Sequence, residues 1–140
     1  MARHAGLWFA AAWALSLTTL GFFVVPMLFV YLPSPALAGA MAAHLFQVQT
    51  GISAVCACLL LGFALPHVQD TGGRRFMALA ALGLTCALAA EFWVSPHIIA
   101  RDNLAFWHRL GSGFYLLHWL CAMAAFHLQI RRAGTAQAGE

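Results

Sequence analysis

The chain has 140 residues, of which 63% are hydrophobic and 8% are charged, and its mean hydropathy is +0.82. A soluble fold of this length cannot bury so much apolar surface, so the composition indicates a membrane protein. The net charge is +3, and no lysine contributes to it. No Gly-rich phosphate loop, nucleophile elbow or zinc-protease signature is present. Nucleic-acid binding and common hydrolase chemistry are therefore not indicated.

Four apolar stretches are long enough to cross a bilayer, which takes about 20 residues. They are Leu7–Tyr31, Ala38–Leu65, Phe76–Pro96 and Leu104–Ile130. The first is longer than the apolar run of a secretory signal, about 7–15 residues, so we expect a retained helix. The predicted fold class is all-α, an integral membrane four-helix bundle that forms a single transmembrane domain over residues 1–140.

The connections between the stretches differ in character. Proline fixes its own φ and keeps the preceding residue out of the helical region, so Pro33, Ser34 and Pro35 predict a short, stiff turn. Ser34 is expected to cap the second helix, with Pro35 at its first position. The segment from Pro66 to Arg75 is polar and predicts a loop.

Arginine placement predicts the orientation. The positive-inside rule assigns the side with more basic residues to the cytoplasm. One side carries Arg3, Arg74, Arg75, Arg131 and Arg132, whereas the other carries Arg101 and Arg109. Both termini are therefore expected in the cytoplasm, with the chain in a bacterial inner membrane.

A five-residue pattern that ends in proline occurs twice, as residues 22–26 (FFVVP) and residues 92–96 (FWVSP). We interpret residues 1–66 and 76–132 as degenerate repeats, two parallel helical hairpins in which Pro26 and Pro96 have structural roles. Because proline lacks an N–H, Pro96 leaves the carbonyl of Phe92, one turn earlier, without a donor.

Polar residues concentrate in the predicted non-cytoplasmic halves of the last three helices. Ionisable groups at membrane depth usually face a protein interior or a cavity, so these residues predict a ligand-binding pocket. Its candidate residues are Glu91, His108, Ser112, Gln49, Ser53, Gln47 and Arg109. The alternative is structural, with Glu91 paired to Arg109 and His108 bonded to Ser112 or to a carbonyl.

Histidines raise the question of a metal or a cofactor. His44, His97 and His108 are candidate imidazole ligands for copper or zinc, although their spacing forms no compact motif. A haem would need axial histidines on facing helices. The deepest histidine is His118, which we expect to be a buried residue with a hydrogen-bond partner.

Several short segments resemble a known family. They are Leu45-Phe46, Ile52-Ser53 and Cys56-Ala57 in the second helix, Pro96 after the third, and Phe106, His108 and Ser112 in the fourth. In their order and spacing, the chain resembles the small membrane proteins related to eukaryotic transmembrane protein 205, whose bacterial members form a domain of unknown function. That eukaryotic relative has been linked to platinum-drug resistance, so the resemblance implies metal handling or export.

These observations favour a membrane protein that binds or translocates a small solute or a metal cation through an outer-facing polar pocket. Two alternatives stay open: a haem- or copper-associated redox or cofactor-delivery protein, and a structural accessory subunit of a membrane complex. A non-enzymatic role is favoured. A homo-oligomer is expected within the lipid bilayer, because four helices make a small transporter.

Overall fold

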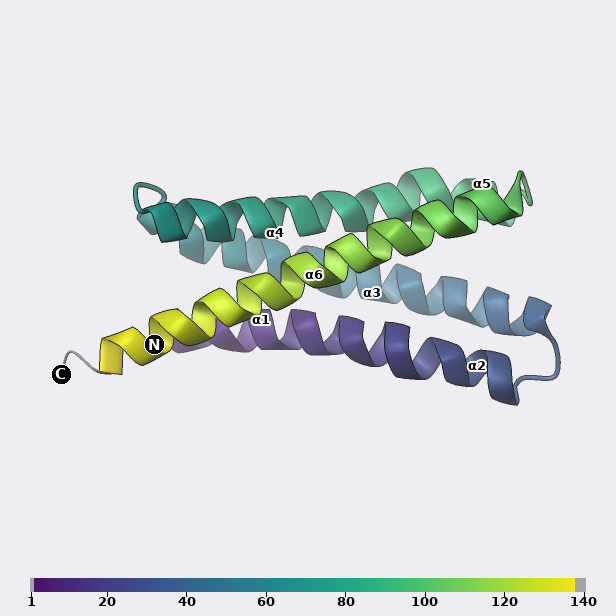
Figure 1. The fold of residues 1–140 in the computed structure, drawn as a ribbon, viewed down its shortest axis with the longest axis horizontal. Helices are drawn as coiled ribbons and strands as arrows, with labels where there is room; N and C mark the ends of the chain where they lie inside the picture. The colour runs from purple at the N-terminus through teal and green to yellow at the C-terminus, as the bar shows by residue number, and fades with distance from the viewer. Residues whose placement is uncertain (1, 138–140) are drawn as a thin grey trace.

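The computed structural model describes the backbone of residues 2–137 and the side chains of residues 5–134. Its elements form four helical rods without a strand in the described backbone (Figure 1). The first rod comprises α1 (Ala2–Thr19), the π-helical turn η1 (Leu20–Val24) and α2 (Val25–Tyr31). The second comprises α3 (Pro35–Ala64) and the 3₁₀ turn η2 (Leu65–His67). The third comprises α4 (Thr71–Ala89), the π-helical turn η3 (Ala90–Val94) and α5 (Ser95–Ile99), and the fourth is α6 (Leu104–Gln137).

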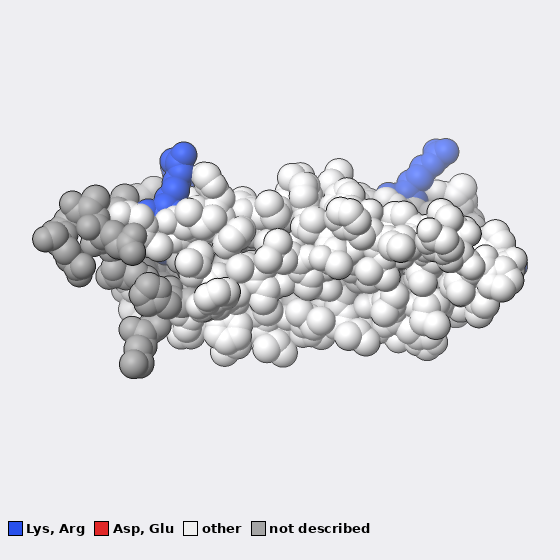
Figure 2. Space-filling model, turned by 90° about the horizontal axis from the view of Figure 1, so that it is seen from below, with Lys and Arg blue, Asp and Glu red and all other residues white. Residues whose placement is uncertain are grey.

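The four rods confirm the predicted all-α class. Each is long and apolar enough to span a membrane, with hydropathies from 1.3 to 2.0 over Ala5–Tyr31, Pro35–His67, Thr71–Ile99 and Leu104–Gly134. Large apolar side chains such as Val30 and Phe92 are exposed on the outside of the bundle. On the face shown in Figure 2, basic side chains appear only near the two ends of the long axis. This distribution suits a surface surrounded by lipid.

The rods share one long axis, and the start of α1 and the end of α6 lie at the same end of the bundle (Figure 1). Both α1 and α4 pack against α3 and against α6. The long helix α6 crosses the bundle, from beside α5 at one end to beside the start of α1 at the other. We call the end with α2 and α5 the hairpin end, and the end with the start of α1 and the end of α6 the terminal end.

Helix starts follow local chemistry. As predicted, the Ser34 hydroxyl accepts a hydrogen bond from the Leu37 N–H at 3.3 Å, and Pro35 is the first residue of α3. Helix α4 begins at Thr71, five residues before the start expected from hydropathy. Much of the expected loop before Phe76 is therefore helical, because a helix can extend beyond its apolar run into polar sequence.

The centre of the bundle is built around Trp13, which is fully buried. Its ring reaches α4, where a Cβ on Gly83 would lie 2.8 Å from it. The core of the terminal half is apolar and includes Leu60, Phe76 and Ala122. The hydrogen-bonded polar side chains Gln49 and His118 lie instead in the middle of the bundle.

Candidate functional site

Two π-helical turns stand in the same relation to a proline. In η1 the Val25 N–H donates to the Leu20 carbonyl, and Pro26 follows; in η3 the Ser95 N–H donates to the Ala90 carbonyl, and Pro96 follows. These bonds span five residues instead of the four of an α-helix. A wider turn accommodates the proline ring, which clashes with the preceding turn of a regular helix. Both prolines consequently lie within continuous helical rods.

The second π turn changes which carbonyl lacks a donor. In an α-helix the Glu91 carbonyl would accept from the Ser95 N–H, and in π register it would accept from residue 96. Here the Ser95 N–H bonds to the Ala90 carbonyl, and Pro96 has no N–H. The Glu91 carbonyl is therefore released, one residue before the Phe92 carbonyl to which the proline alone points.

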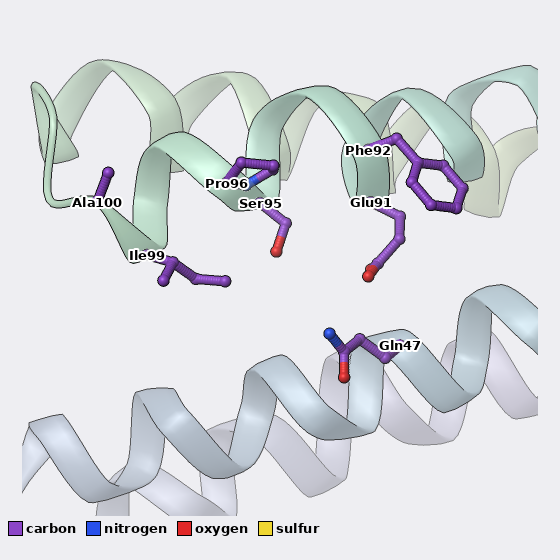
Figure 3. A pocket seen from close by; sticks show the side chains of 7 residues that line it. All are labelled: Gln47, Glu91, Phe92, Ser95, Pro96, Ile99 and Ala100. Carbon is purple, nitrogen blue, oxygen red and sulfur yellow. The ribbon is translucent and has the colours of Figure 1, made fainter.

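A cleft of about 480 Å³ opens beside this released backbone, between α3 and the η3–α5 segment (Figure 3). The Glu91 carboxylate and the Gln47 amide point toward each other across the gap, and the Ser95 hydroxyl points into it. The cleft is lined by Gln47, Glu91, Phe92, Ser95, Pro96, Ile99 and Ala100. It combines one carboxylate and two neutral polar groups with apolar walls.

Glu91 is the one acidic residue of this cleft. It lies about two helical turns inside the span that ends at Ile99, a depth of about 12 Å at 1.5 Å per residue. Within residues 5–134 no ion pair joins it to a basic side chain, and the expected partner Arg109 is exposed on α6. A lone carboxylate at this depth needs a compensating cation or a proton.

Gln49 and Ser53, two other predicted pocket residues, lie in the core. The Gln49 Nε2 donates to Ser16 Oγ at 3.0 Å and to Ser53 Oγ at 3.3 Å. Ser53 is fully buried. Ser16 is in α1, so the three side chains join α1 to α3. Gln47 faces the cleft instead, because two residues along a helix turn the side chain by about 200°.

The remaining predicted site residues do not line the cleft. His108, Arg109 and Ser112 are exposed along α6, and His44 is exposed on α3. His97 stacks on Trp107 with ring centroids 3.9 Å apart, and its Nδ1 lies 3.6 Å from Asp102 Oδ2. The described side chains contain no group of three acidic, histidine or cysteine residues able to hold a metal. The candidate metal ligands are therefore not brought together.

Aromatic side chains of α6 make contacts that the sequence analysis missed. Tyr115 had no assigned partner in α1, yet its hydroxyl donates to the Leu17 carbonyl at 2.6 Å. The Trp119 Nε1 donates to Thr18 Oγ1 at 2.9 Å. Together with the buried His118 they follow an i, i+3, i+4 spacing, which identifies one helix face and was the available signal.

Tyr115 occupies the first π turn. The Gly21 position has no Cβ, and a Cβ there would collide with the Tyr115 ring. Tyr115 therefore fills the space between α1 and α6 at the first π turn. Between α3 and the second π turn, by contrast, the cleft at Glu91 is open.

The sequence matches a known protein family. The sequence profile described as a domain of unknown function, DUF4149, matches residues 8–106. No curated protein and no solved structure matches the chain. The profile covers more than half of the chain, including both π turns and the whole cleft. The chain therefore belongs to the DUF4149 family.

Proposed function

We propose that this membrane protein binds a small organic cation in the cleft between Glu91 and Gln47. The observation that carries the proposal is the Glu91 carboxylate, placed in the span without a basic partner and facing a cleft. A cation in the cleft would supply the missing charge, and Gln47 and Ser95 would orient it. The released Glu91 carbonyl adds one more acceptor beside the carboxylate.

The chemistry of the cleft favours an organic cation over a transition metal. Its polar atoms are oxygens and one amide nitrogen, whereas copper and zinc sites in proteins use imidazole and thiolate ligands. Phe92, Pro96 and Ile99 provide apolar walls. A volume of about 480 Å³ lies within the range of small-molecule sites, about 300–1,000 Å³. A single carboxylate matches a singly charged ligand.

The comparison between the two π turns supports the same site. If residues 1–66 and 76–132 are copies of one hairpin, Gly21 and Glu91 occupy the same position in each copy. Tyr115 fills the first position and locks two helices together. The second position has a carboxylate and an open cleft, so we assign the ligand to that copy.

The proposed orientation places the cleft in the outer half of the bacterial inner membrane. Arg74, Arg75, Arg131 and Arg132 at the terminal end support cytoplasmic termini. The apolar core of the terminal half offers no polar lining, so the ligand would enter from the hairpin end or from the bilayer. Translocation would then require a second conformation, in which α3 and α4 separate further along their length.

The resemblance to transmembrane protein 205 implies metal handling or export, through the link to platinum-drug resistance. We propose an organic cation instead, because the cleft offers oxygen atoms and one amide nitrogen and no imidazole or thiolate ligand.

Equilibrium dialysis of the detergent-purified full chain would test the proposed function. Tetraphenylphosphonium serves as the cation and triphenylphosphine oxide as a neutral molecule of similar shape. We expect saturable binding of the cation only. Glu91→Gln, which keeps the shape but removes the charge, should weaken it about tenfold or more, as expected for a lost charged contact.

Asp102→Asn is the matched control. It removes an exposed carboxylate at the same end of the bundle, so cation binding should be unchanged. Equal binding of the cation and the neutral molecule, or wild-type affinity in Glu91→Gln, would refute the assignment.

A further inference from the structure

A second groove lies near the terminal end, between α4 and α6. Its volume is about 470 Å³, and it is lined by Arg75, Ala78, Leu79, Ala124, His127 and Leu128. In Figure 1, α6 crosses away from α4 toward α1 as it approaches this end. Divergence of the two helices leaves this groove on the outside of the bundle.

On each helix, the basic residue of the groove lies nearer the terminal end than an alanine of the lining. On α4, Arg75 is nearest the terminal end, and Ala78 and Leu79 follow at i+3 and i+4 on the same helix face. On α6, which runs in the opposite direction, Ala124 lies deeper than His127. Arg75 and His127 thus lie toward the terminal end, together with Leu128, and Ala78, Leu79 and Ala124 extend the groove toward the middle of the bundle.

Arg132 of α6, which does not line the groove, supplies a further basic group near the same end of α4. Its guanidinium carbon lies 5.7 Å from the centre of the Phe76 ring on α4. A Cβ on Gly72 would lie 3.0 Å from Arg132 Nη2. The side chain therefore extends from α6 to the first turn of α4, three residues before Arg75 in the sequence.

We propose that this groove is a binding site for an anionic phospholipid. The phosphate would contact Arg75 and Arg132, with His127 beside them, and one acyl chain would lie along Ala78, Leu79 and Ala124. Basic pockets between helices recognise anionic headgroups in this manner. A free phosphate ion would leave these apolar side chains uncovered, so the groove fits a lipid. This proposal is independent of the cation site.

Native mass spectrometry of the detergent-solubilised full chain tests the proposal. Phosphatidylglycerol and phosphatidylcholine with identical acyl chains are offered in equal amounts. We expect one phosphatidylglycerol to be retained preferentially. Arg75→Gln should reduce this preference about fivefold, the effect of one arginine beside an anionic lipid. Ala124→Phe, which fills the groove without changing charge, should reduce retention of the same lipid.

Arg101→Gln is the matched control, because Arg101 is an exposed arginine at the hairpin end. It should leave the preference unchanged. Equal retention of the two lipids, an unchanged preference in Arg75→Gln, or an equal loss in Arg101→Gln would each overturn the proposal. Competition by inorganic phosphate together with normal binding in Ala124→Phe would assign the basic groups to a free anion instead, which also overturns it.

Discussion

Trp13 and His118 are joined across the centre of the bundle by a hydrogen bond of 3.0 Å from the indole Nε1 to the imidazole Nε2. Both side chains are buried, and they belong to α1 and α6. The bond defines the protonation of the imidazole, because a nitrogen that accepts a hydrogen bond carries no proton. His118 is thus the buried, partnered histidine that the sequence predicted.

Trp13→Phe should destabilise the fold by about 1–3 kcal/mol, because the His118 Nε2 would remain buried without a donor. The free energy of unfolding in mild detergent, followed by circular dichroism, measures this loss. Trp8→Phe provides the comparison, since Trp8 is 74% exposed and its replacement should leave the stability unchanged. A Trp13→Phe protein as stable as the wild type would show that the bond contributes nothing net.

Gly21→Ala should also destabilise the fold. The new methyl group would collide with the Tyr115 ring, and overpacking of this kind costs about 1–3 kcal/mol. Gly51→Ala is the matched control, because no atom lies within 4 Å of the Cβ position there and alanine favours a helix. Adding Tyr115→Leu to Gly21→Ala should recover part of the stability, as measured by the same unfolding curves. Equal effects of the two glycine replacements would be inconsistent with the close approach at Gly21.

Pro96→Ala tests the link between the π turn and the cleft. Alanine supplies the N–H that proline lacks, so the Glu91 carbonyl gains a donor and is no longer available to a cation. We expect tetraphenylphosphonium affinity to fall about tenfold, the size of a lost contact to a charged group. Pro66→Ala, in the 3₁₀ turn at the terminal end, should bind as the wild type does. Wild-type affinity in Pro96→Ala would show that the Glu91 carbonyl does not contribute to cation binding.

Gln49→Leu separates the structural polar residues from the cleft. The amide donates to both Ser16 and Ser53, so its loss should lower stability by about 1–2 kcal/mol. Cation affinity should be unaffected, because Gln49 does not line the cleft. Dialysis and unfolding measured on the same preparation distinguish the two effects. A large loss of affinity without a loss of stability would place Gln49 in the binding site after all.

The membrane-spanning architecture was predictable because it depends on local composition. Long apolar runs identified four spans, and the proline-serine-proline turn identified the cap at Ser34. The start of α4 was less predictable, since hydropathy reports the apolar part of a helix and Thr71 begins its polar extension.

The candidate site was only partly predictable, because its geometry depends on which helix faces meet. Glu91 and Gln47 were both identified as pocket residues, and they do line one cleft. The grouping with His108 and Ser112 relied on membrane depth alone, and depth does not specify the direction of a side chain. The pairing of Trp13 with His118 joins residues 105 positions apart, a separation over which local patterns carry no information.

Each π turn is equivalent to one residue inserted into a regular α-helix. The wider turn absorbs that residue, so α5 keeps its face toward α3. If Ala90–Val94 adopted regular α-helical bonds instead, the extra residue would rotate α5 by about 100° relative to α4, carrying Ser95 and Ile99 away from α3. Loss of the π turn alone would thus abolish the cleft while leaving all of its lining residues in the sequence.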